Sequence, residues 1–245
     1  MAAGRPRAAI VTGGAAGIGL GIVQRLLDDG MNVLAADRNP DACDVARRLL
    51  EGRPAHVMEA DMADEERVRE VMDEALVHFG RIDLLCNNAG VRHIAPLADI
   101  PFADWQESFR VNVDAALLGA RAVLPAMREQ GSGVIVNIGS ISGTAPYAEG
   151  GAYGASKAAL IALTRVMAME FGPLGVRVNC IAPGSIDRES TGEMSSSHIP
   201  IGRTGVPQDV ASLVAYLASD EASYLNGAVI VLDGGATAGR TRPGR

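Results

Sequence analysis

Short apolar runs alternate with longer amphipathic segments along the whole chain. Seven runs have the length and β-rich composition of strands, at residues 8–11, 32–36, 55–58, 82–86, 133–138, 176–181 and 228–232. Between the first two runs, Ile18, Ile22 and Leu26 recur at helical spacing, and Gly30 can end that helix. Strands that alternate with helices predict a doubly wound α/β fold, with a parallel seven-stranded sheet covered by helices on both faces.

No linker, repeat or shift of composition divides the chain, so we expect one domain over residues 1–245. Residues 184–200 differ from the rest, because they are rich in serine and lack an apolar period. This segment is predicted to be a mobile loop beside the substrate, and residues 238–245 a flexible tail with solvated arginines.

Composition narrows the possible functions. The 245 residues are 48% hydrophobic and 21% charged, which suits a globular protein with a full-sized core. A net charge of -7 offers no basic surface for nucleic acid. No apolar run approaches the roughly 18 residues of a membrane span, and the run at 8–11 is too short for a secretion signal, so the cytoplasm is predicted. Cys43, Cys86 and Cys180 show no metal-ligand spacing and are expected to be buried thiols in a reducing compartment.

A glycine-rich turn follows the first strand, in the sequence Thr12-Gly13-Gly14-Ala15-Ala16-Gly17-Ile18-Gly19. Gly13 permits a tight turn, Gly17 leaves room for a pyrophosphate, and Gly19 lets the following helix pack closely on the sheet. The helix N-terminus then faces an anion. Because the turn lies between a strand and a helix, the pattern predicts a dinucleotide site.

Asp37 indicates which dinucleotide. It ends the second strand, 18 residues after Gly19, where a carboxylate can accept hydrogen bonds from the ribose hydroxyls and repels a 2′-phosphate. Arg38 is a competing observation, since an arginine can hold that phosphate, but the glycine turn contains no basic residue to help it. We therefore predict NAD rather than NADP. The alternative for Asp37 is that it is only a turn residue at the end of the strand, and Arg38 is interpreted as a solvated surface charge rather than a cofactor ligand.

Three further residues suggest proton transfer at the same edge of the sheet. Tyr153 and Lys157 are four apart and share one helix face, so the ammonium can lower the pKa of the phenol and make it a base. Ser140 follows the strand at 133–138 and can hydrogen-bond a substrate oxygen. Singly, each is more simply a surface or loop residue; together, behind a dinucleotide turn, they favour catalysis.

The glycine turn and the Ser140, Tyr153 and Lys157 set occur together with Asn87-Asn88-Ala89-Gly90, Asn112, Pro183-Gly184 and Asp233-Gly234-Gly235. These motifs have the order and spacing of the short-chain dehydrogenase/reductase family, and the chain resembles that family over nearly its whole length. The resemblance implies that Asn112 anchors a water chain carrying the proton from Lys157, and that Asp61 and Met62 edge the adenine. From the sequence alone, Asp61 is a helix N-cap. The implied cofactor-binding set also contains Ile18, Asn88, Ala89, Gly90, Tyr153, Lys157, Pro183, Gly184 and Ile186. A homotetramer is implied, built from the helices after Asp104 and Ala152 and the last strand.

The chain departs from the family after Pro183-Gly184. The family has a threonine two residues after an aliphatic position, which holds the nicotinamide carboxamide, whereas Ile186 is followed here by Asp187-Arg188. Ser190 or Thr191 could supply the missing hydroxyl. We expect this short loop to be open without ligand and to become ordered on binding.

The remaining polar residues give weaker indications. His56, His78 and His198 lack the spacing of metal ligands, so no metal is predicted. Arg92 with His93, and Glu149, could face the substrate, whereas Trp105 more simply packs its helix. The sequence thus predicts an NAD-dependent oxidoreductase acting on a secondary alcohol or ketone. An NADPH-dependent ketoacyl-type reductase is one alternative, and a nucleotide-sensing Rossmann protein without turnover is another, which the catalytic set argues against.

Overall fold

The computed structural model describes residues 6–188, 191 and 195–239, and these form one α/β domain. The strands are β1 (Ala8–Thr12), β2 (Asn32–Asp37), β3 (Ala55–Glu59), β4 (Leu84–Asn87), β5 (Gly133–Ile138), β6 (Val176–Pro183) and β7 (Val229–Leu232). The helices are α1 (Gly17–Asp28), α2 (Pro40–Leu49), α3 (Glu65–Phe79), α4 (Phe102–Phe109), α5 (Ala115–Gln130), α6 (Gly151–Phe171) and α7 (Pro207–Ala218). Each predicted strand is confirmed, with shifts of at most two residues at the ends.

The strands form one parallel sheet in the order β3-β2-β1-β4-β5-β6-β7. The order reverses between β1 and β4, and in doubly wound sheets ligands bind beyond the carboxyl ends of the strands at that point. The glycine turn follows β1 and the Asn88-Ala89-Gly90 segment follows β4. The topology therefore brings both cofactor motifs to one crevice.

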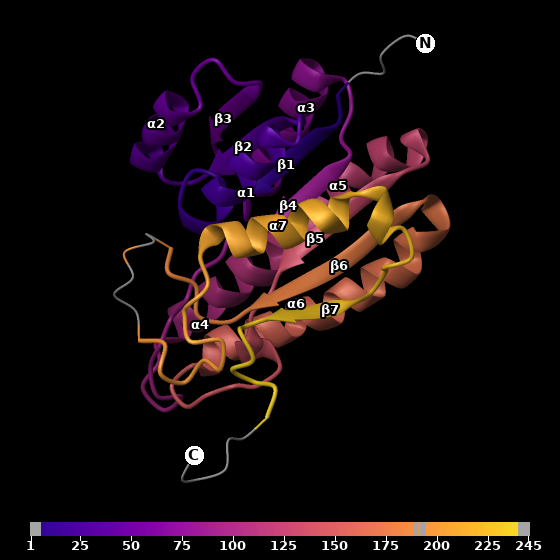
Figure 1. Ribbon diagram of the computed structural model, residues 1–245. Helices are drawn as coiled ribbons and strands as arrows, with labels where there is room; N and C mark the ends of the chain where they lie inside the picture. Colours follow the sequence, from indigo (N-terminus) through magenta and orange to yellow (C-terminus); the bar gives the residue numbers. More distant parts are fainter. Residues whose placement is uncertain (1–5, 189–190, 192–194, 240–245) are drawn as a thin grey trace.

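Two hydrophobic cores sandwich the sheet, which is why the strands are apolar on both faces. Side chains of α1, α2 and α7 bury one face against Val11, Val33 and Val136. Side chains of α3, α5 and α6 bury the other against Ile10 and Ile135. Figure 1 shows α7 crossing the sheet next to α1, as the pairing of these two helices in the first core requires.

Two predictions about local structure need comment. Asp64, rather than Asp61, caps α3: its carboxylate accepts hydrogen bonds from the backbone N of Glu66 and Arg67, at 2.9 and 3.3 Å. The N-cap interpretation of Asp61 is therefore wrong, because the helix begins one turn later than that position requires. Cys43, Cys86 and Cys180 are all buried free thiols, as expected. None of the helices in the described part of the chain has the length and apolar character needed to cross a membrane.

Candidate active site and cofactor cleft

The glycine turn is tied to the end of β4. The Thr12 hydroxyl accepts hydrogen bonds from the backbone N of Asn88 and Ala89, both at 3.0 Å. The Asn88 side-chain amide in turn donates to the carbonyl oxygens of Thr12 and Gly13, both at 3.0 Å. The Asn88 side chain thus holds the turn, which leaves the backbone of this segment to line the cleft.

Steric constraints explain the glycines. Gly13 and Gly17 have φ values of +61° and +51°, which favour glycine. A Cβ atom on Gly19 would lie 1.9 Å from the Gly13 carbonyl oxygen, so that position admits no side chain. The turn therefore forms a bare backbone cradle at the N-terminus of α1, which is the environment that a dinucleotide pyrophosphate needs. The residues present fit such a cofactor.

Asp37 lies where an adenosine ribose is expected. Its carboxylate accepts hydrogen bonds from the backbone N of Ala15, at 3.2 Å, and of Asn39, at 3.1 Å. The neighbouring Arg38 forms an ion pair: its Nη1 donates to the Glu107 carboxylate on α4 at 3.1 Å. The negative charge at the end of β2 is therefore anchored in the turn, while the adjacent positive charge is paired.

Asp61 and Met62 follow β3 at the same edge. Burial raises the pKa of Asp61, but hydrogen bonds from the Ala63 backbone N, at 3.0 Å, and from Arg110, at 3.1 Å, outweigh it and hold the pKa below the usual value. The carboxylate stays ionised and can accept a further hydrogen bond from an adenine amino group. The Met62 side chain is buried in the core, so only its backbone can border the adenine.

Asn112 is buried in a π-helical turn, Arg110–Asp114, inserted between α4 and α5. Its Oδ1 accepts from the backbone N of Val91, at 2.9 Å, and its Nδ2 donates to the Val91 carbonyl, at 3.0 Å. Nδ2 also donates to the Ser156 hydroxyl at 2.9 Å, and that hydroxyl donates to the Tyr153 carbonyl at 2.8 Å. The sequence does not reveal the π-turn, a feature that recurs at functional sites.

Lys157 is buried beside the other predicted catalytic residues. Its Nζ lies 5.9 Å from the centroid of the Tyr153 ring. A Cβ atom on Gly90 would lie 3.0 Å from the Asn112 Oδ1 and 3.4 Å from the Lys157 Nζ. The Asn112 and Lys157 side chains therefore both pack against Gly90. Burial lowers the pKa of Lys157 to about 8, and the charge of Arg188 adds to the lowering.

Ser140 is the N-cap of a 3₁₀ turn, Ile141–Gly143, directly after β5. Its hydroxyl accepts from the Ser142 backbone N at 3.1 Å and donates to the Ser142 hydroxyl at 3.2 Å. Ser140 is only 7% exposed, so its hydroxyl is largely shielded from solvent. A chain of buried hydrogen bonds, which we call the buried amide chain, lies in β4, β5 and α6 and is not apparent from the sequence. The Asn87 amide donates to the Asn137 Oδ1 at 2.8 Å, and the Asn137 amide donates to the Thr164 hydroxyl at 2.9 Å. Its only sequence signal is an asparagine inside each of two apolar strands.

Two loops meet on the substrate side. The Arg92 guanidinium donates to the Tyr147 hydroxyl, at 3.0 Å from Nη2, and lies 5.9 Å from the ring centroid. Glu149 has φ +67° and accepts a hydrogen bond on its carbonyl from the Ala95 backbone N, at 2.9 Å. His93 turns away from Arg92 and contacts Glu107 at 2.9 Å. The Arg92-His93 pair is therefore split: Arg92, on the loop after β4, contacts the loop that precedes Tyr153, whereas His93 contacts α4.

The loop after β6 is held at its start. Gly184 packs against Asp233, where a Cβ atom would lie 2.7 Å from the Asp233 Cβ. Ile186 forms an isolated parallel bridge with Gly205. The aliphatic stem of the exposed Arg188 lies over the glycine turn, since a Cβ atom on Gly17 would lie 3.5 Å from the Arg188 Cβ. Ser190 lies outside the described residues, and Thr191 is exposed.

The other singled-out side chains lie apart from this cleft or pack locally. Trp105 packs on Phe109 in α4, with ring centroids 5.1 Å apart, as expected. His198 is exposed. What remains at the edge of the sheet is an anion-binding turn beside a buried ammonium, a phenol and a hydroxyl, which together can bind a dinucleotide and move a proton to or from an oxygen.

Comparisons with known proteins agree with this chemistry. A family model described as enoyl-(acyl carrier protein) reductase matches residues 13–237. The chain is 37% identical to cis-4-hydroxycyclohexanecarboxylate dehydrogenase of Sinomonas cyclohexanicum, over 95% of this chain and 97% of that protein. It is 36% identical to a 3-oxoacyl-[acyl-carrier-protein] reductase of Thermotoga maritima, over 92% and 96%.

A solved structure is also similar to this chain. The crystal structure of an oxidoreductase of Burkholderia thailandensis, described as a short chain dehydrogenase/reductase, superposes with a TM-score of 0.88 at 33% identity, covering 96% of this chain and 94% of that one. Fold and sequence relationships therefore coincide over nearly the whole chain.

Proposed function

The chain belongs to the short-chain dehydrogenase/reductase family, a family of pyridine-nucleotide oxidoreductases, and on this premise we propose that it transfers a hydride between NAD and a secondary alcohol or ketone. The observation that carries the proposal is the arrangement around Gly90. The buried Lys157 ammonium and the Asn112 carboxamide converge there, one helical turn from Tyr153 and next to the glycine turn.

When bound, the nicotinamide accepts or supplies the hydride, and the protein supplies the rest. In the direction of oxidation, the Tyr153 phenol removes the hydroxyl proton of the substrate. Lys157 supplies the positive charge that favours the ionised phenol. Ser140 donates a hydrogen bond to the substrate oxygen and stabilises the charge that develops on it. Asn112, fixed on both sides by Val91 and Ser156, holds the position from which water returns the proton to solvent.

The preference for NAD is supported by the two charged residues at the end of β2. Asp37 presents a carboxylate at the ribose position, where it repels a 2′-phosphate. Arg38, the residue that could compensate, is paired with Glu107. An NADPH-dependent reductase of the ketoacyl type is the alternative, favoured by the reductase of Thermotoga maritima among the relatives. It requires Arg38 to leave Glu107 and turn toward the cofactor.

We propose that the substrate carries an anionic group. Arg92 lies two residues after Gly90, beside the Val91 backbone that holds Asn112, and it contacts Tyr147 in the loop that precedes Tyr153. A guanidinium in this position can bind a carboxylate on the substrate. The relative in Sinomonas cyclohexanicum is named for a hydroxycarboxylate, which supports the same class here.

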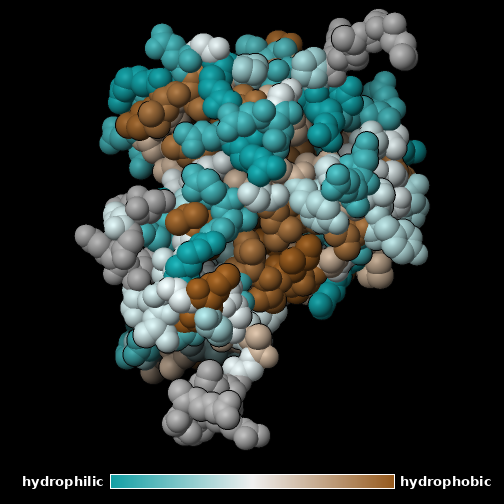
Figure 2. All heavy atoms as spheres, viewed as in Figure 1, coloured by the Kyte–Doolittle hydropathy of each residue, from teal (hydrophilic) through white to brown (hydrophobic). Residues whose placement is uncertain are grey.

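We also propose that the protein forms a homo-oligomer, a tetramer by family resemblance. Strand β7 is an edge of the sheet and ends it with four apolar residues, of which Val231 is 44% exposed. Figure 2 shows a brown, apolar surface over the region of β7. Covering this strand with a second copy would remove an exposed sheet edge. Sedimentation of the protein and of a Val231→Lys variant tests this, since a monomeric unmutated protein contradicts it.

A cytoplasmic location stays a prediction.

The proposed reaction is tested by incubating the protein with NAD and a panel of secondary alcohols, including hydroxycarboxylates, while NADH absorbance is followed. The Tyr153→Phe variant is the control: it should lose turnover by about 100-fold or more, because a general base contributes about that factor. Its affinity for NAD should be unchanged, because the phenol hydroxyl acts on the substrate proton. NAD binding without turnover on any alcohol would instead favour the nucleotide-sensing alternative.

A further inference from the structure

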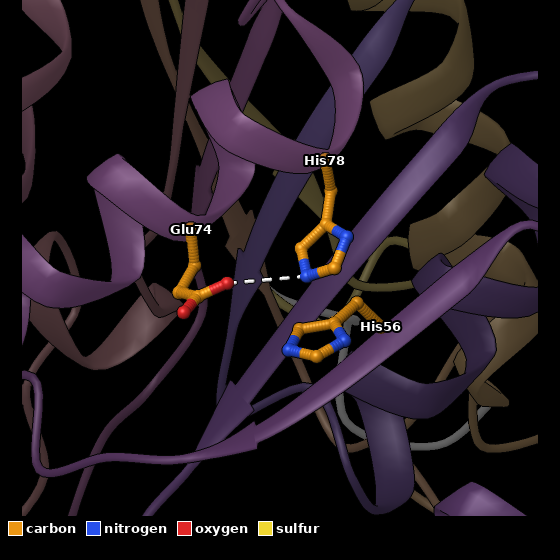
Figure 3. A group of neighbouring side chains, drawn as sticks. All are labelled: His56, Glu74 and His78. Atoms are coloured by element: carbon orange, nitrogen blue, oxygen red, sulfur yellow. Dashed lines mark ion pairs between the residues drawn. The ribbon is translucent and has the colours of Figure 1, made fainter.

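Three potential metal ligands, His56 and the pair Glu74 and His78, lie side by side (Figure 3). His56 is the second residue of β3, whereas Glu74 and His78 lie in the last turns of α3. In an α/β unit the helix runs back along the strands, so the end of α3 reaches the amino-terminal edge of the sheet. Sequence spacing treats these histidines as isolated; the fold brings them together.

The three side chains already enclose a common point. Glu74 Oε2 lies 3.1 Å from His78 Nε2. The imidazole rings of His56 and His78 are 4.4 Å apart between centroids, with an angle of 32° between their planes. One ligand atom from each residue lies within 4.8 Å of the other two. Ligand atoms around a tetrahedral zinc are about 3.4 Å apart, given bond lengths near 2.1 Å. The 3.1 Å between Glu74 and His78 is close to that spacing, and the distances from His56, at most 4.8 Å, have to shorten by at most about 1.4 Å.

The charges suit a cation. Glu74 contributes a carboxylate, and His56 and His78 contribute imidazole nitrogens. Arg47, which donates a hydrogen bond to the Val57 carbonyl next to His56, is itself paired with Asp44 at 2.6 Å. Two imidazoles and a carboxylate form a set that prefers zinc and neighbouring transition metals over magnesium or calcium.

We propose that His56, Glu74 and His78 bind one Zn²⁺ ion, with water completing a tetrahedral site. The ion links β3 to α3. Because β3 is the outermost strand and pairs only with β2, a metal that bridges it to the helix stabilises the edge of the sheet that holds Asp37 and Asp61. The site is separate from hydride transfer, since these residues lie at the amino ends of the strands and the cleft lies at the carboxyl ends.

Isothermal titration of Zn²⁺ into untagged, EDTA-treated protein tests the assignment. We expect one saturable ion per chain. His56→Ala and His78→Ala should each weaken binding by about 10- to 100-fold or more, the range seen even when only the support of a metal ligand is removed. His198→Ala and His93→Ala are the matched controls, because each deletes a histidine elsewhere and should leave the affinity unchanged. Mg²⁺ should not compete at equal concentration.

Two further readouts separate a bound ion from a folding defect. Zn²⁺ should raise the thermal midpoint of the unmutated protein and of the two controls, but not of the His56 and His78 variants. Imidazole ¹⁵N spectra should show both histidines fixed by the metal. Absence of saturable binding, equal affinity in the His56 and His78 variants, or displacement by Mg²⁺ would overturn the proposal. None of these outcomes depends on the oxidoreductase reaction.

Discussion

The Nζ of Lys157 donates a hydrogen bond to the carbonyl oxygen of Ile138 at 2.8 Å. Ile138 ends β5, and Ser140 stands two residues further along the same chain segment. One strand end therefore positions both the ammonium and the hydroxyl. The buried amide chain from Asn87 through Asn137 reaches the residue before Ile138 and fixes this strand end from behind.

The buried ammonium predicts a pH dependence of stability. Burial lowers the pKa of Lys157 from 10.5 to about 8, so between these values the unfolded chain binds a proton that the folded chain does not. The contribution of Lys157 to the free energy of unfolding should therefore rise with pH over that window, by about 3 kcal/mol. Urea unfolding of cofactor-free protein and of a Lys157→Met variant, from pH 8 to 10.5, measures this as the difference between the two curves.

The two urea-unfolding curves have to be subtracted because burial raises the pKa of the Cys86 and Cys180 thiols. Above pH 9 the unfolded chain loses these protons while the folded chain keeps them, so the free energy of unfolding falls in both proteins. The Cys86 contribution is common to the two proteins and cancels, whereas the Lys157 charge lowers the pKa of Cys180, so both curves are measured in a Cys180→Ala background. A difference that is flat or falls across the window would contradict the prediction.

The pairing of Arg38 with Glu107 predicts how the cofactor preference can be changed. In the unmutated protein, NAD should bind at least about tenfold more tightly than NADP, equivalent to about 1.4 kcal/mol. Glu107→Gln releases Arg38, so NADP should bind several-fold more tightly while NAD is unaffected; Asp37→Ala should also narrow the gap. The control is the double variant Arg38→Ala with Glu107→Gln, which should lose the gain. Equal dissociation constants for the two cofactors in the unmutated protein would disprove the preference.

Arg188 is predicted to bind the cofactor pyrophosphate, because its stem lies over Gly17 at the N-terminus of α1. Arg188→Ala should weaken NAD binding about tenfold, the loss of one charge-assisted hydrogen bond, and Arg188→Lys should restore part of it. Fluorescence titration with ADP and with adenosine separates the phosphate contact from other effects. An equal loss of affinity for adenosine, which carries no phosphate, would show that Arg188 acts otherwise.

Arg92 is predicted to select anionic substrates. Arg92→Gln should raise KM for hydroxycarboxylates about tenfold, since a charged hydrogen bond contributes about 1.5 kcal/mol, and should leave KM for neutral alcohols of the same ring size nearly unchanged. Tyr147→Phe removes the hydroxyl partner but keeps the guanidinium, so it is the matched control and should retain the preference. If KM rises equally for both substrate classes, Arg92 has only a structural role.

The sequence predicts the strands well, because each is an apolar run buried on both faces, as in β5, where all six residues are buried. It also predicts which residues share the cleft, since parallel strands place Gly13, Asn88 and Ser140 at one edge. What the sequence does not reveal depends on side-chain contacts between distant segments. Examples are the pairing of Arg38 with Glu107, 69 residues away, and the stacking of His56 on His78. The sequence does not distinguish Asp61 from Asp64 as the N-cap, because both are acidic residues ahead of one helix and only the backbone geometry separates them.

The π-helical turn at Arg110–Asp114 makes chain length itself a determinant of the site. A π-turn holds one residue more than the α-helix around it, so deleting a single residue there would restore regular α-helix and rotate Asn112 by about 100° relative to the following segment. The bonds from Asn112 to Val91 and Ser156 would then be lost. A homologue could keep the asparagine, serine, tyrosine and lysine in order and still lack a working proton path. Gaps in an alignment at this turn therefore carry as much functional information as the catalytic letters.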